Sequence, residues 1–276
     1  MNPFHHRLAT DIPLIEMGAL NALISAKFDP KAAEHPGMTQ LRQRLKPQAT
    51  MLDGGVCSIP VEGVLARKPD PFEMAFCGVE DSGAVQKLIE SAAADPAVRG
   101  ILLCIDSPGG MVTGGLEIAD AVAQASKSKA VVAYTGGMAA SMGYYIASQA
   151  SQIVASRSAV VGSIGCIISF FNYAKMLADA GITQHVFTNS DATLKAAGSP
   201  GLPLSDAQKA YFQSRVDAVG KDFQAAVQNA RGPLPDAAKT GAVFFAGEAK
   251  KMGLIDRVGS EAFALGVLKR EMRSRG

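Results

Sequence analysis

Three glycine-rich segments in the middle of the chain could present backbone N–H groups to a ligand. They cover residues 106–110 (Asp-Ser-Pro-Gly-Gly), 136–141 (Gly-Gly-Met-Ala-Ala-Ser) and 162–165 (Gly-Ser-Ile-Gly), and each follows an apolar run that predicts a strand. In α/β sheets, binding sites form where strands end and helices begin. Glycine at such a place lets N–H groups point into a cavity. A single Gly-Gly turn usually does no more than reverse the chain, but three in succession predict a site.

Ser141 stands where the second of these segments meets a helix that we predict over residues 140–150. A serine in this position most often caps the helix through its hydroxyl. The residues before it, from Gly136 to Ala140, are small apart from Met138, which leaves room for a substrate chain beside the hydroxyl. The helix N-terminus would also stabilise negative charge that develops nearby. Helix capping and nucleophilic catalysis are therefore both open interpretations of Ser141.

A serine nucleophile needs a base to take its proton, and histidine is the usual one. His5, His6 and His35 lie in the first 50 residues, which we expect to be an appendage. His185 lies in a segment that we predict to be a strand, 183–188, where a histidine is more often a packed or edge residue. The four histidines are therefore poor candidates for the base of a Ser-His-Asp triad.

Lys195 is the best candidate for a base of another type. Lysine can serve as a base where burial lowers its pKa. Lys195 is the only charged residue in the segment 192–204, and its neighbours Leu194, Ala196 and Ala197 offer no carboxylate to hold it protonated. The alternative is an ordinary loop lysine in water, and spacing alone does not decide between the two.

The elements that must position these residues alternate between strands and helices. Such repeated β-then-α units imply an α/β fold with a mainly parallel sheet and helices packed outside it. Residues 1–50, interrupted by prolines, predict an N-terminal appendage with one helix, and residues 51–276 predict a single domain with a C-terminal helical tail. The predicted strands cover residues 56–60, 61–66, 100–105, 130–134, 152–155, 183–188 and 254–258. The predicted helices cover residues 14–27, 81–94, 113–124, 140–150, 173–180, 205–230, 247–253 and 261–273, and residues 67–80 and 189–204 are expected to be loops.

Composition limits the classes of protein that this chain can belong to. It has 276 residues, 48% of them hydrophobic, which suffices for a substantial core. The net charge of +2 gives no basic excess for nucleic-acid binding, and we interpret the basic stretch 269–275 as a solvated helix end. Residues 130–156 contain no Asp, Glu, Lys or Arg, but the Gly-Gly pair and several polar residues within them predict strand, turn and helix rather than a membrane span. We therefore expect a soluble, cytoplasmic protein.

The four cysteines lie far apart and form no Cys-x-x-Cys motif. Three of them stand in apolar runs, which predicts buried, reduced thiols rather than a disulfide or a metal site. We expect neither a metal nor a cofactor. The cysteines are Cys57, Cys77, Cys104 and Cys166.

Taken together, the motifs identify a family resemblance that runs from about residue 56 to residue 258. The chain resembles signal peptide peptidase A and its phage relatives, the lambda-type prohead proteases. The resemblance implies a ClpP/crotonase-type fold, a spiral of ββα units, which usually forms homo-oligomers. The segments that carry it are Ile-Asp-Ser-Pro-Gly-Gly at 105–110, Ala-Ser-Met-Gly-Tyr-Tyr-Ile-Ala at 140–147, Val-Gly-Ser-Ile-Gly at 161–165, and the Lys195 segment that ends in Gly-Ser-Pro at 198–200.

The resemblance implies a serine–lysine mechanism. Ser141 would attack the scissile carbonyl and form an acyl-enzyme, and Lys195 would take its proton and later activate water. Ser163 would orient Lys195. The backbone N–H groups of Gly110 and Met142 would form the oxyanion hole.

Small residues of the first two glycine-rich segments are expected to line the substrate. They are Gly109, Gly137 and Ala140, and their size favours small or apolar side chains before the cut. Two positions depart from the family pattern and bear on the substrate pocket. Ala196 stands where an acidic residue often follows the lysine, and residues 201–202 (Gly-Leu) stand where an arginine is common.

Two further segments, 12–16 and 170–173, and the absence of an N-terminal anchor look more phage-like than bacterial. We therefore expect a phage or prophage head-maturation protease that cleaves scaffold, portal or other head proteins within the prohead, in the host cytoplasm. A soluble housekeeping peptidase of the signal-peptide-peptidase type is the close alternative. A crotonase-fold acyl-CoA enzyme and a catalytically silent head protein are more distant ones.

Overall fold

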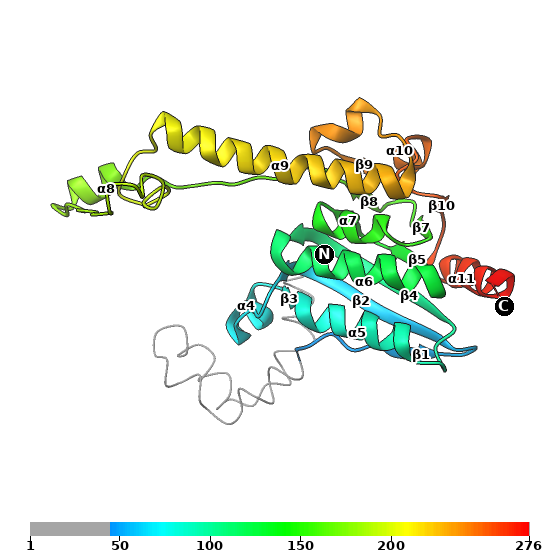
Figure 1. Cartoon of the computed structure of the whole chain (residues 1–276). Coiled ribbons are helices and arrows are strands. Elements are labelled where there is room, and N and C mark those ends of the chain that lie inside the picture. Colours follow the sequence, from blue (N-terminus) through cyan, green and yellow to red (C-terminus); the bar gives the residue numbers. More distant parts are fainter. Residues whose placement is uncertain (1–44, 276) are drawn as a thin grey trace, which may run out of the picture. The chain divides into compact units, whose positions relative to one another are not determined.

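The computed structural model describes residues 45–275, which belong to two units (Figure 1). Unit 1 consists of Met1–Ile164 and Ala226–Gly276, and unit 2 consists of Gly165–Ala225. The predicted appendage helix at 14–27 and most of the predicted appendage at 1–50 lie outside the described residues. Within the described part of the chain, no helix is both long and apolar enough to cross a membrane.

A mainly parallel sheet forms the centre of unit 1. Its strands follow the order β10-β7-β5-β4-β6-β8-β9. Outside this path, β2 pairs with β4, and β1 and β3 each pair with β2. Two pairs, β1 with β2 and β8 with β9, are antiparallel. The strands are β1 (Thr50–Leu52), β2 (Val56–Ala66), β3 (Val79–Asp81), β4 (Gly100–Gly110), β5 (Ala130–Thr135), β6 (Met138–Ala140), β7 (Gln152–Ala155), β8 (Val160–Gly162), β9 (Val243–Phe245) and β10 (Arg257–Val258).

Strand β4 organises this sheet because it is long enough to pair with two strands in succession on the same side. Its first half pairs with β5, from Gly100 to Cys104, and Ser107 pairs with Ala139 of β6. On its other side it pairs with β2 over nearly its whole length. The predicted strand at 100–105 therefore continues to Gly110, and the first glycine-rich segment is the end of a strand rather than a turn.

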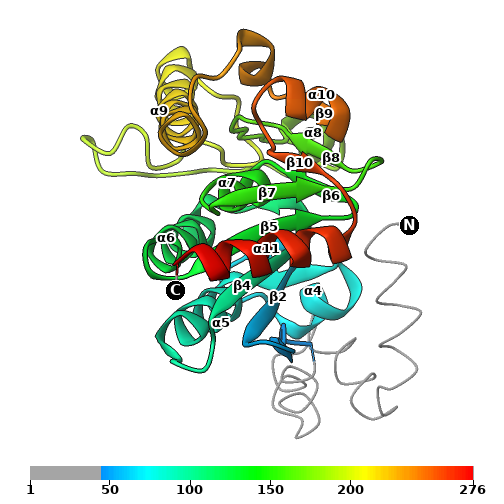
Figure 2. The same ribbon diagram turned by 90° about the vertical axis from the view of Figure 1, so that its right-hand side faces the viewer.

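Helices cover both faces of the sheet (Figure 2). Helices α5 and α6 pack on one face, and α11 packs against β4 and β5 on the other. Asp81 caps α5, accepting a hydrogen bond from the Gly83 N–H at 3.1 Å. Among the described residues, the helices with residues in unit 1 are α4 (Pro71–Phe76), α5 (Ser82–Ala94), α6 (Val112–Ser128), α7 (Met142–Ser148), the end of α9 (Asp206–Arg231), the 3-10 helix η3 (Asp236–Thr240), α10 (Ala246–Lys251) and α11 (Glu261–Arg275).

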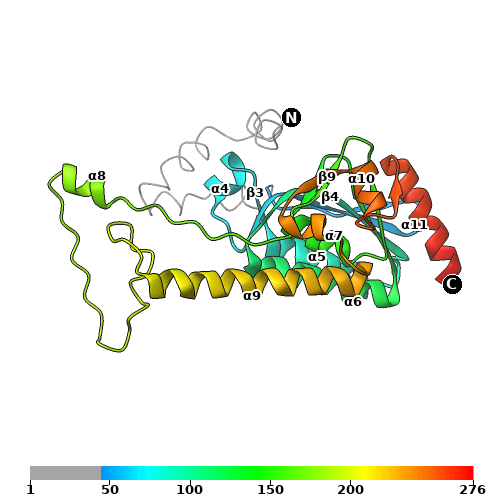
Figure 3. The same cartoon turned by 90° about the horizontal axis from the view of Figure 1, so that it is seen from above.

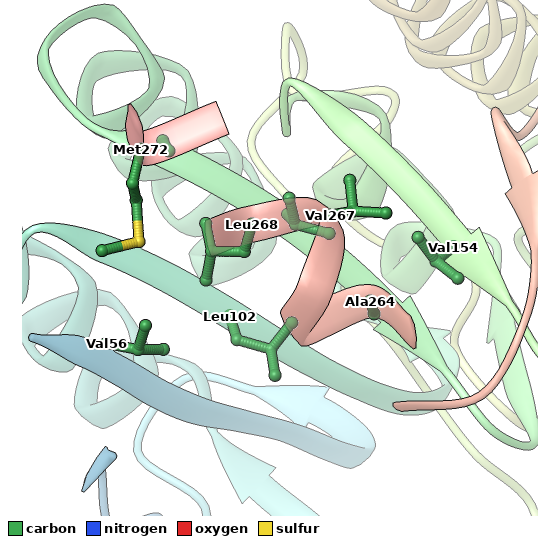
Figure 4. Close-up of a cluster of buried hydrophobic side chains, with 9 residues drawn as sticks. Val56, Leu102, Val154, Ala264, Val267, Leu268 and Met272 are labelled. Atoms are coloured by element: carbon green, nitrogen blue, oxygen red, sulfur yellow. The ribbon is translucent and has the colours of Figure 1, made fainter. Parts of the chain in front are cut away.

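The α11 face shows how the core of unit 1 is built (Figure 4). Leu268 and Met272 of α11 lie over Val56 and Leu102 of the sheet, and all four side chains are buried. Gly100 lets the helix approach closely, since a Cβ there would lie 2.7 Å from the Met272 sulfur. Burying one large aliphatic side chain in this way stabilises the fold by about 1.5–3 kcal/mol.

Unit 2 contains α8 (Ala174–Asp179), the first part of α9 and a long irregular segment between them. Helix α9 is one unbroken helix that begins in unit 2 and ends in unit 1 (Figure 3). Phe223 is the one buried residue of unit 2, and many large apolar side chains are exposed. The exposed ones are Ile167, Ile168, Phe170, Phe171, Tyr173, Met176, Ile182, Val186, Phe187, Leu194 and Tyr211.

Several predictions about local structure are wrong. The segment 183–188 is irregular rather than a strand, because no strand of unit 2 is available to pair with it, and His185 is exposed. The loop predicted at 67–80 contains α4 and β3. Cys77 is exposed rather than buried.

Candidate active site

Ser141 has an unusual backbone conformation. It lies just before α7 with φ 49° and ψ −123°, and its side chain makes no capping hydrogen bond. A positive φ is rare for a residue with a side chain and costs about 1–3 kcal/mol, so it persists only where the surroundings impose it. The Ser141 N–H donates to the Gly162 carbonyl at 2.9 Å, and the Ser141 carbonyl accepts from the Tyr145 N–H at 2.9 Å. The helix-capping interpretation of Ser141 is therefore wrong.

Gly109 of β4 lies directly against Ser141. A Cβ added to Gly109 would lie 2.7 Å from the Ser141 Cβ, 3.1 Å from its Oγ and 3.0 Å from the Met142 nitrogen. Gly109 itself has φ 117°, which a residue with a side chain rarely adopts. Only glycine fits at this position, and the first two glycine-rich segments meet here.

The N–H groups of Gly110 and Met142 have no partner within their own elements. The Met111 N–H donates to the Leu65 carbonyl of β2 at 2.8 Å. Because successive N–H groups of a strand point to opposite edges, the Gly110 N–H points away from β2, toward the edge on which β6 pairs. Met142 is the first residue of α7, where N–H groups have no acceptor inside the helix. Both groups are therefore available on the side where Ser141 lies.

The rest of α7 is fixed by close packing and one buried hydroxyl. Gly143 allows contact with β4, since a Cβ there would lie 2.9 Å from the Ser107 carbonyl oxygen. Tyr144 is fully buried, and its hydroxyl donates to the Leu254 carbonyl at 2.8 Å. Burial raises the pKa of the Tyr144 hydroxyl well above its ordinary value. These contacts hold the helix that carries Ser141 at its start.

Ser163, in the third glycine-rich segment, is next to Ser141 in the sheet. Ala140 pairs with Gly162, so the residues that follow them, Ser141 and Ser163, lie at the ends of neighbouring strands. Ser163 also has a positive φ, 53°, and its N–H donates to the Ala242 carbonyl at 2.7 Å. Among the described residues, the non-glycine residues with positive φ are these two serines and Lys68.

The second glycine-rich segment contacts the first through the Asp106 side chain. The Met138 N–H donates to the Asp106 carboxylate at 3.1 Å, and a Cβ on Gly137 would lie 2.7 Å from the same oxygen. Gly137 is exposed and Ala140 is buried. Sequence reasoning missed this role of Asp106. Its place at the head of the first segment, where a short acidic side chain can bond to nearby N–H groups, was a usable signal.

Lys195 belongs to unit 2, whereas Ser141, Ser163, Gly110 and Met142 belong to unit 1. It lies in a series of turns in which its own N–H donates to the Ala192 carbonyl at 3.0 Å. Its side chain is exposed, so the burial that we expected of a lysine base is not present in the part of the chain that the structure describes. Among the residues described, no three His, Cys, Asp or Glu side chains are grouped so that they could hold a metal ion.

Comparison with protein families agrees with this architecture. Residues 80–161 match the family model for Clp protease, which together with the parallel sheet and outer helices confirms the expected ClpP/crotonase-type α/β fold. Residues 123–274 match the model for peptidase family S49, and this match spans more than half of the chain. The chain therefore belongs to peptidase family S49, which confirms the resemblance seen in the sequence.

Individual relatives come from phages, archaea and bacteria. Capsid assembly protease C of Escherichia phage lambda is 30% identical over 223 residues, covering 80% of this chain and 50% of the relative. A putative protease of Methanocaldococcus jannaschii is 33% identical over 185 residues, covering 64% of this chain and 58% of the relative. A putative signal peptide peptidase SppA of Enterococcus faecium is 33% identical over 184 residues, covering 65% and 53%. The chain thus spans about half the length of the curated relatives that it matches.

Solved structures of low sequence identity also overlay on the chain. A member of the enoyl-CoA hydratase/isomerase family has a TM-score of 0.49 and 20% identity, covering 84% of this chain and 77% of that chain.

Proposed function

We propose that this chain is a serine endopeptidase, with Ser141 as its nucleophile, and that the peptidase domain spans residues 51–276. The observation that carries the proposal is the strained Ser141, held at the start of α7 against Gly109 with its hydroxyl unused in capping. Strain of this kind concentrates at functional sites. Membership of peptidase family S49 supports the same assignment.

The proposed oxyanion hole consists of the N–H groups of Gly110 and Met142. They would bind the oxygen of the substrate carbonyl as it becomes negatively charged, and removing such a donor commonly lowers the rate by about 10²–10³. Gly109, Gly137 and Ala140 would line the substrate chain. A substrate with small or apolar side chains before the cut is what these residues favour.

Lys195 is the proposed general base, and Ser163 the residue that orients it. Lysine accepts a proton only in its neutral form, which removal from water favours. The exposed Lys195 must therefore become enclosed when substrate or a further copy of the chain completes the site. The position of Ser163 beside Ser141 in the sheet supports its role, since a hydroxyl there could hydrogen-bond to the neutral Lys195 amine and direct it to the nucleophile.

The proposed reaction has two halves. The Ser141 Oγ attacks the peptide carbonyl while its proton moves to the Lys195 amine, and the tetrahedral intermediate collapses to an acyl-enzyme. The amine of the departing peptide leaves with the proton from Lys195. Water then attacks the acyl-enzyme, with Lys195 again taking the proton, and the carboxylic acid product leaves as Ser141 regains its hydrogen.

We further propose that the natural substrates are phage head proteins. In support, the phage lambda relative, named for capsid assembly, matches 80% of this chain at 30% identity, and a head-tail preconnector protein of phage P21 matches 80% at 29%. The protein would act as a homo-oligomer in the host cytoplasm or inside the prohead. The putative signal peptide peptidase at 33% identity keeps a housekeeping role as the second candidate.

The test compares cleavage of casein and of a co-expressed scaffold protein by wild type, Ser141→Ala and Lys195→Ala. We expect each variant to lose at least about 10³-fold in rate, because the nucleophile and base act as a unit. Lys209→Ala is the matched control, since it removes another exposed lysine of unit 2. Circular dichroism verifies that every variant is folded.

The outcomes separate the parts of the proposal. Full activity in Ser141→Ala rejects the nucleophile, and near-full activity in Lys195→Ala rejects the dyad while leaving a serine peptidase. Activity of the wild type should rise toward alkaline pH as a lysine base loses its proton. A rate that is flat from about pH 6 to pH 9 would contradict a lysine base.

A further inference from the structure

Strands β2 and β4 change register next to the site. Glu62 pairs with Asp106, but the next pair joins Val64 to Gly109. Between these two pairs β2 contributes one residue and β4 contributes two, Ser107 and Pro108. The arrangement is a β-bulge, a device that bends a strand and redirects the residues after it.

Proline at this bulge removes a backbone donor, because Pro108 has no N–H group. The Gly63 carbonyl of β2 accepts instead from the Ser107 hydroxyl, at 2.7 Å. The same Oγ accepts a hydrogen bond from the Gly109 N–H at 3.1 Å, and the Gly109 carbonyl lies 3.3 Å from it. A hydroxyl can donate once and accept twice, so one side chain bridges β2 and Gly109.

Ser107 is fully buried and contacts the residues next to both halves of the proposed oxyanion hole, Gly109 and Gly143. Through Gly109 it reaches Ser141, because a Cβ on Gly109 would lie 2.7 Å from the Ser141 Cβ. Its own backbone and Cβ pack against Gly143 of α7, where an added Cβ would lie 2.9 Å and 3.1 Å from the Ser107 carbonyl oxygen and Cβ. Gly110 directly follows Gly109, whose N–H donates to the Ser107 hydroxyl. Met142 directly precedes Gly143, against which Ser107 packs.

We propose that Ser107 is a positioning residue, whose hydroxyl fixes the Gly110 N–H relative to Ser141 and the Met142 N–H. This inference rests on the proposed peptidase function. Oxyanion stabilisation depends on donors that lie 2.7–3.1 Å from the oxygen of the transition state. Without the hydroxyl, the Gly63 carbonyl and the Gly109 N–H both lose their partner. The end of β4 is then free to shift, which changes the distance between the Gly110 N–H and the oxygen of the transition state.

The test measures steady-state kinetics of Ser107→Ala on a peptide substrate that the wild type cleaves. We expect kcat to fall by about 10–100-fold while KM stays within about threefold, since the lost interaction acts on the transition state. A peptide boronic acid, which places an oxygen in the oxyanion hole once Ser141 has added to boron, should bind more weakly by a similar factor. An uncleaved peptide of the same sequence should bind the Ser141→Ala and Ser107→Ala/Ser141→Ala proteins equally well.

Ser148→Ala is the matched control. Ser148 is also fully buried, and its hydroxyl donates to a backbone carbonyl, that of Tyr145, at 2.6 Å. A loss of stability alone would affect both variants in the same way, whereas the split between kcat and KM is expected only in Ser107→Ala. If Ser107→Ala does not fold, Ser107→Cys replaces it, with a weaker donor of similar size and an expected fall in kcat of about tenfold.

Wild-type kcat and boronate affinity in the folded Ser107 variant would overturn the positioning role and leave the peptidase proposal intact. Equal weakening of kcat in Ser148→Ala would also overturn it. Failure of the peptidase proposal itself is seen separately, as wild-type protein whose cleavage does not depend on Ser141.

Discussion

Units 1 and 2 differ in how far their apolar side chains are buried. Unit 1 buries aliphatic side chains on both faces of its sheet and holds the first two glycine-rich segments and the third as far as Ile164. In unit 2 Phe223 alone is buried, while side chains such as Phe171 and Phe187 are exposed. Lys195 is the single proposed catalytic residue in unit 2. The parts of the site that need fixed geometry therefore lie in the unit with the core.

Hydrogen bonding follows the same division. In unit 1 the bonds around Ser141 join residues far apart in the sequence, such as the Ser163 N–H and the Ala242 carbonyl. Around Lys195 they join residues three apart, for example the Ser199 N–H and the Ala196 carbonyl at 3.1 Å. Local bonds with little burial give low resistance to opening. Stability should therefore reside in unit 1, and unit 2 should contribute little to it.

The largest difference is expected from removing an apolar side chain in each unit. Leu102→Ala deletes a core side chain that is 1% exposed, and it should lower the free energy of unfolding by about 2–5 kcal/mol. Phe187→Ala deletes a larger side chain that is 92% exposed, and it should change the free energy by less than about 0.5 kcal/mol. Urea denaturation of both variants measures the two values.

Analytical ultracentrifugation of the same variants provides the control, because a second copy could cover Phe187 in solution. Equal destabilisation by the two substitutions, with no change in oligomeric state, would show that the contrast between the units is wrong. If Phe187→Ala instead dissociates an oligomer, the exposed side chains of unit 2 form a subunit interface.

A smaller difference is expected from two ion pairs, one in each unit. Arg231 and Asp256 in unit 1 are joined at 2.6 Å with side chains only 9% and 33% exposed, and the same Asp256 oxygen accepts from the Ile153 N–H. Arg231→Met leaves the carboxylate partly buried without its partner and should cost about 2 kcal/mol.

Lys175→Met is the comparison in unit 2. Its pair with Asp179 is 2.7 Å long, but the lysine side chain is 87% exposed, so the loss should be below about 0.5 kcal/mol. Thermal unfolding at two salt concentrations measures both effects. A loss in Lys175→Met as large as in Arg231→Met would contradict the assignment of stability to unit 1.

Sequence patterns predicted unit 1 better than unit 2. Continuous apolar runs identified β5 and β7 almost to the residue, because strands buried on both faces need them. The strand predicted at 183–188 is absent, because the segment contains only two apolar residues, Val186 and Phe187, and has no strand to pair with. A strand exists only with its neighbour, and a neighbour cannot be read from a local pattern. Three-residue strands such as β6 and β8 were missed for the same reason.

The sequence indicated candidate residues for the site, whose roles stay predictions, but not the geometry of the site. Glycine positions and the family resemblance identified Ser141, Ser163 and the turns around them. The positive φ of both serines depends on carbonyls at Gly162 and Ala242, and nothing in the local sequence of either serine signals it. Pro108 in the middle of a strand could have indicated the bulge, since proline within a sheet is restricted to edges and bulges.

The smallest effect is expected at Tyr144, the buried hydroxyl of α7. Tyr144→Phe removes its hydrogen bond to the Leu254 carbonyl and should lower the free energy of unfolding at neutral pH by about 1 kcal/mol. Kinetic parameters should change little if α7 keeps its place in the core through the remaining packing. The same substitution in a surface tyrosine of unit 2, Tyr211→Phe, provides the control.

The free energy of unfolding measured above pH 10 tests the burial of Tyr144 more directly than its value at neutral pH does. Burial raises the pKa of its hydroxyl above the ordinary value of 10.0, so above that pH the unfolded chain releases a proton that the folded chain retains. The free energy of unfolding must then fall with rising pH, by about 1 kcal/mol between pH 10 and pH 11 for this one group. Tyr144→Phe should remove that part of the decline, and Tyr211→Phe should not. Parallel declines in wild type and Tyr144→Phe would mean that the Tyr144 hydroxyl ionises as readily in the folded as in the unfolded protein, and that unit 1 is open to water at the base of α7.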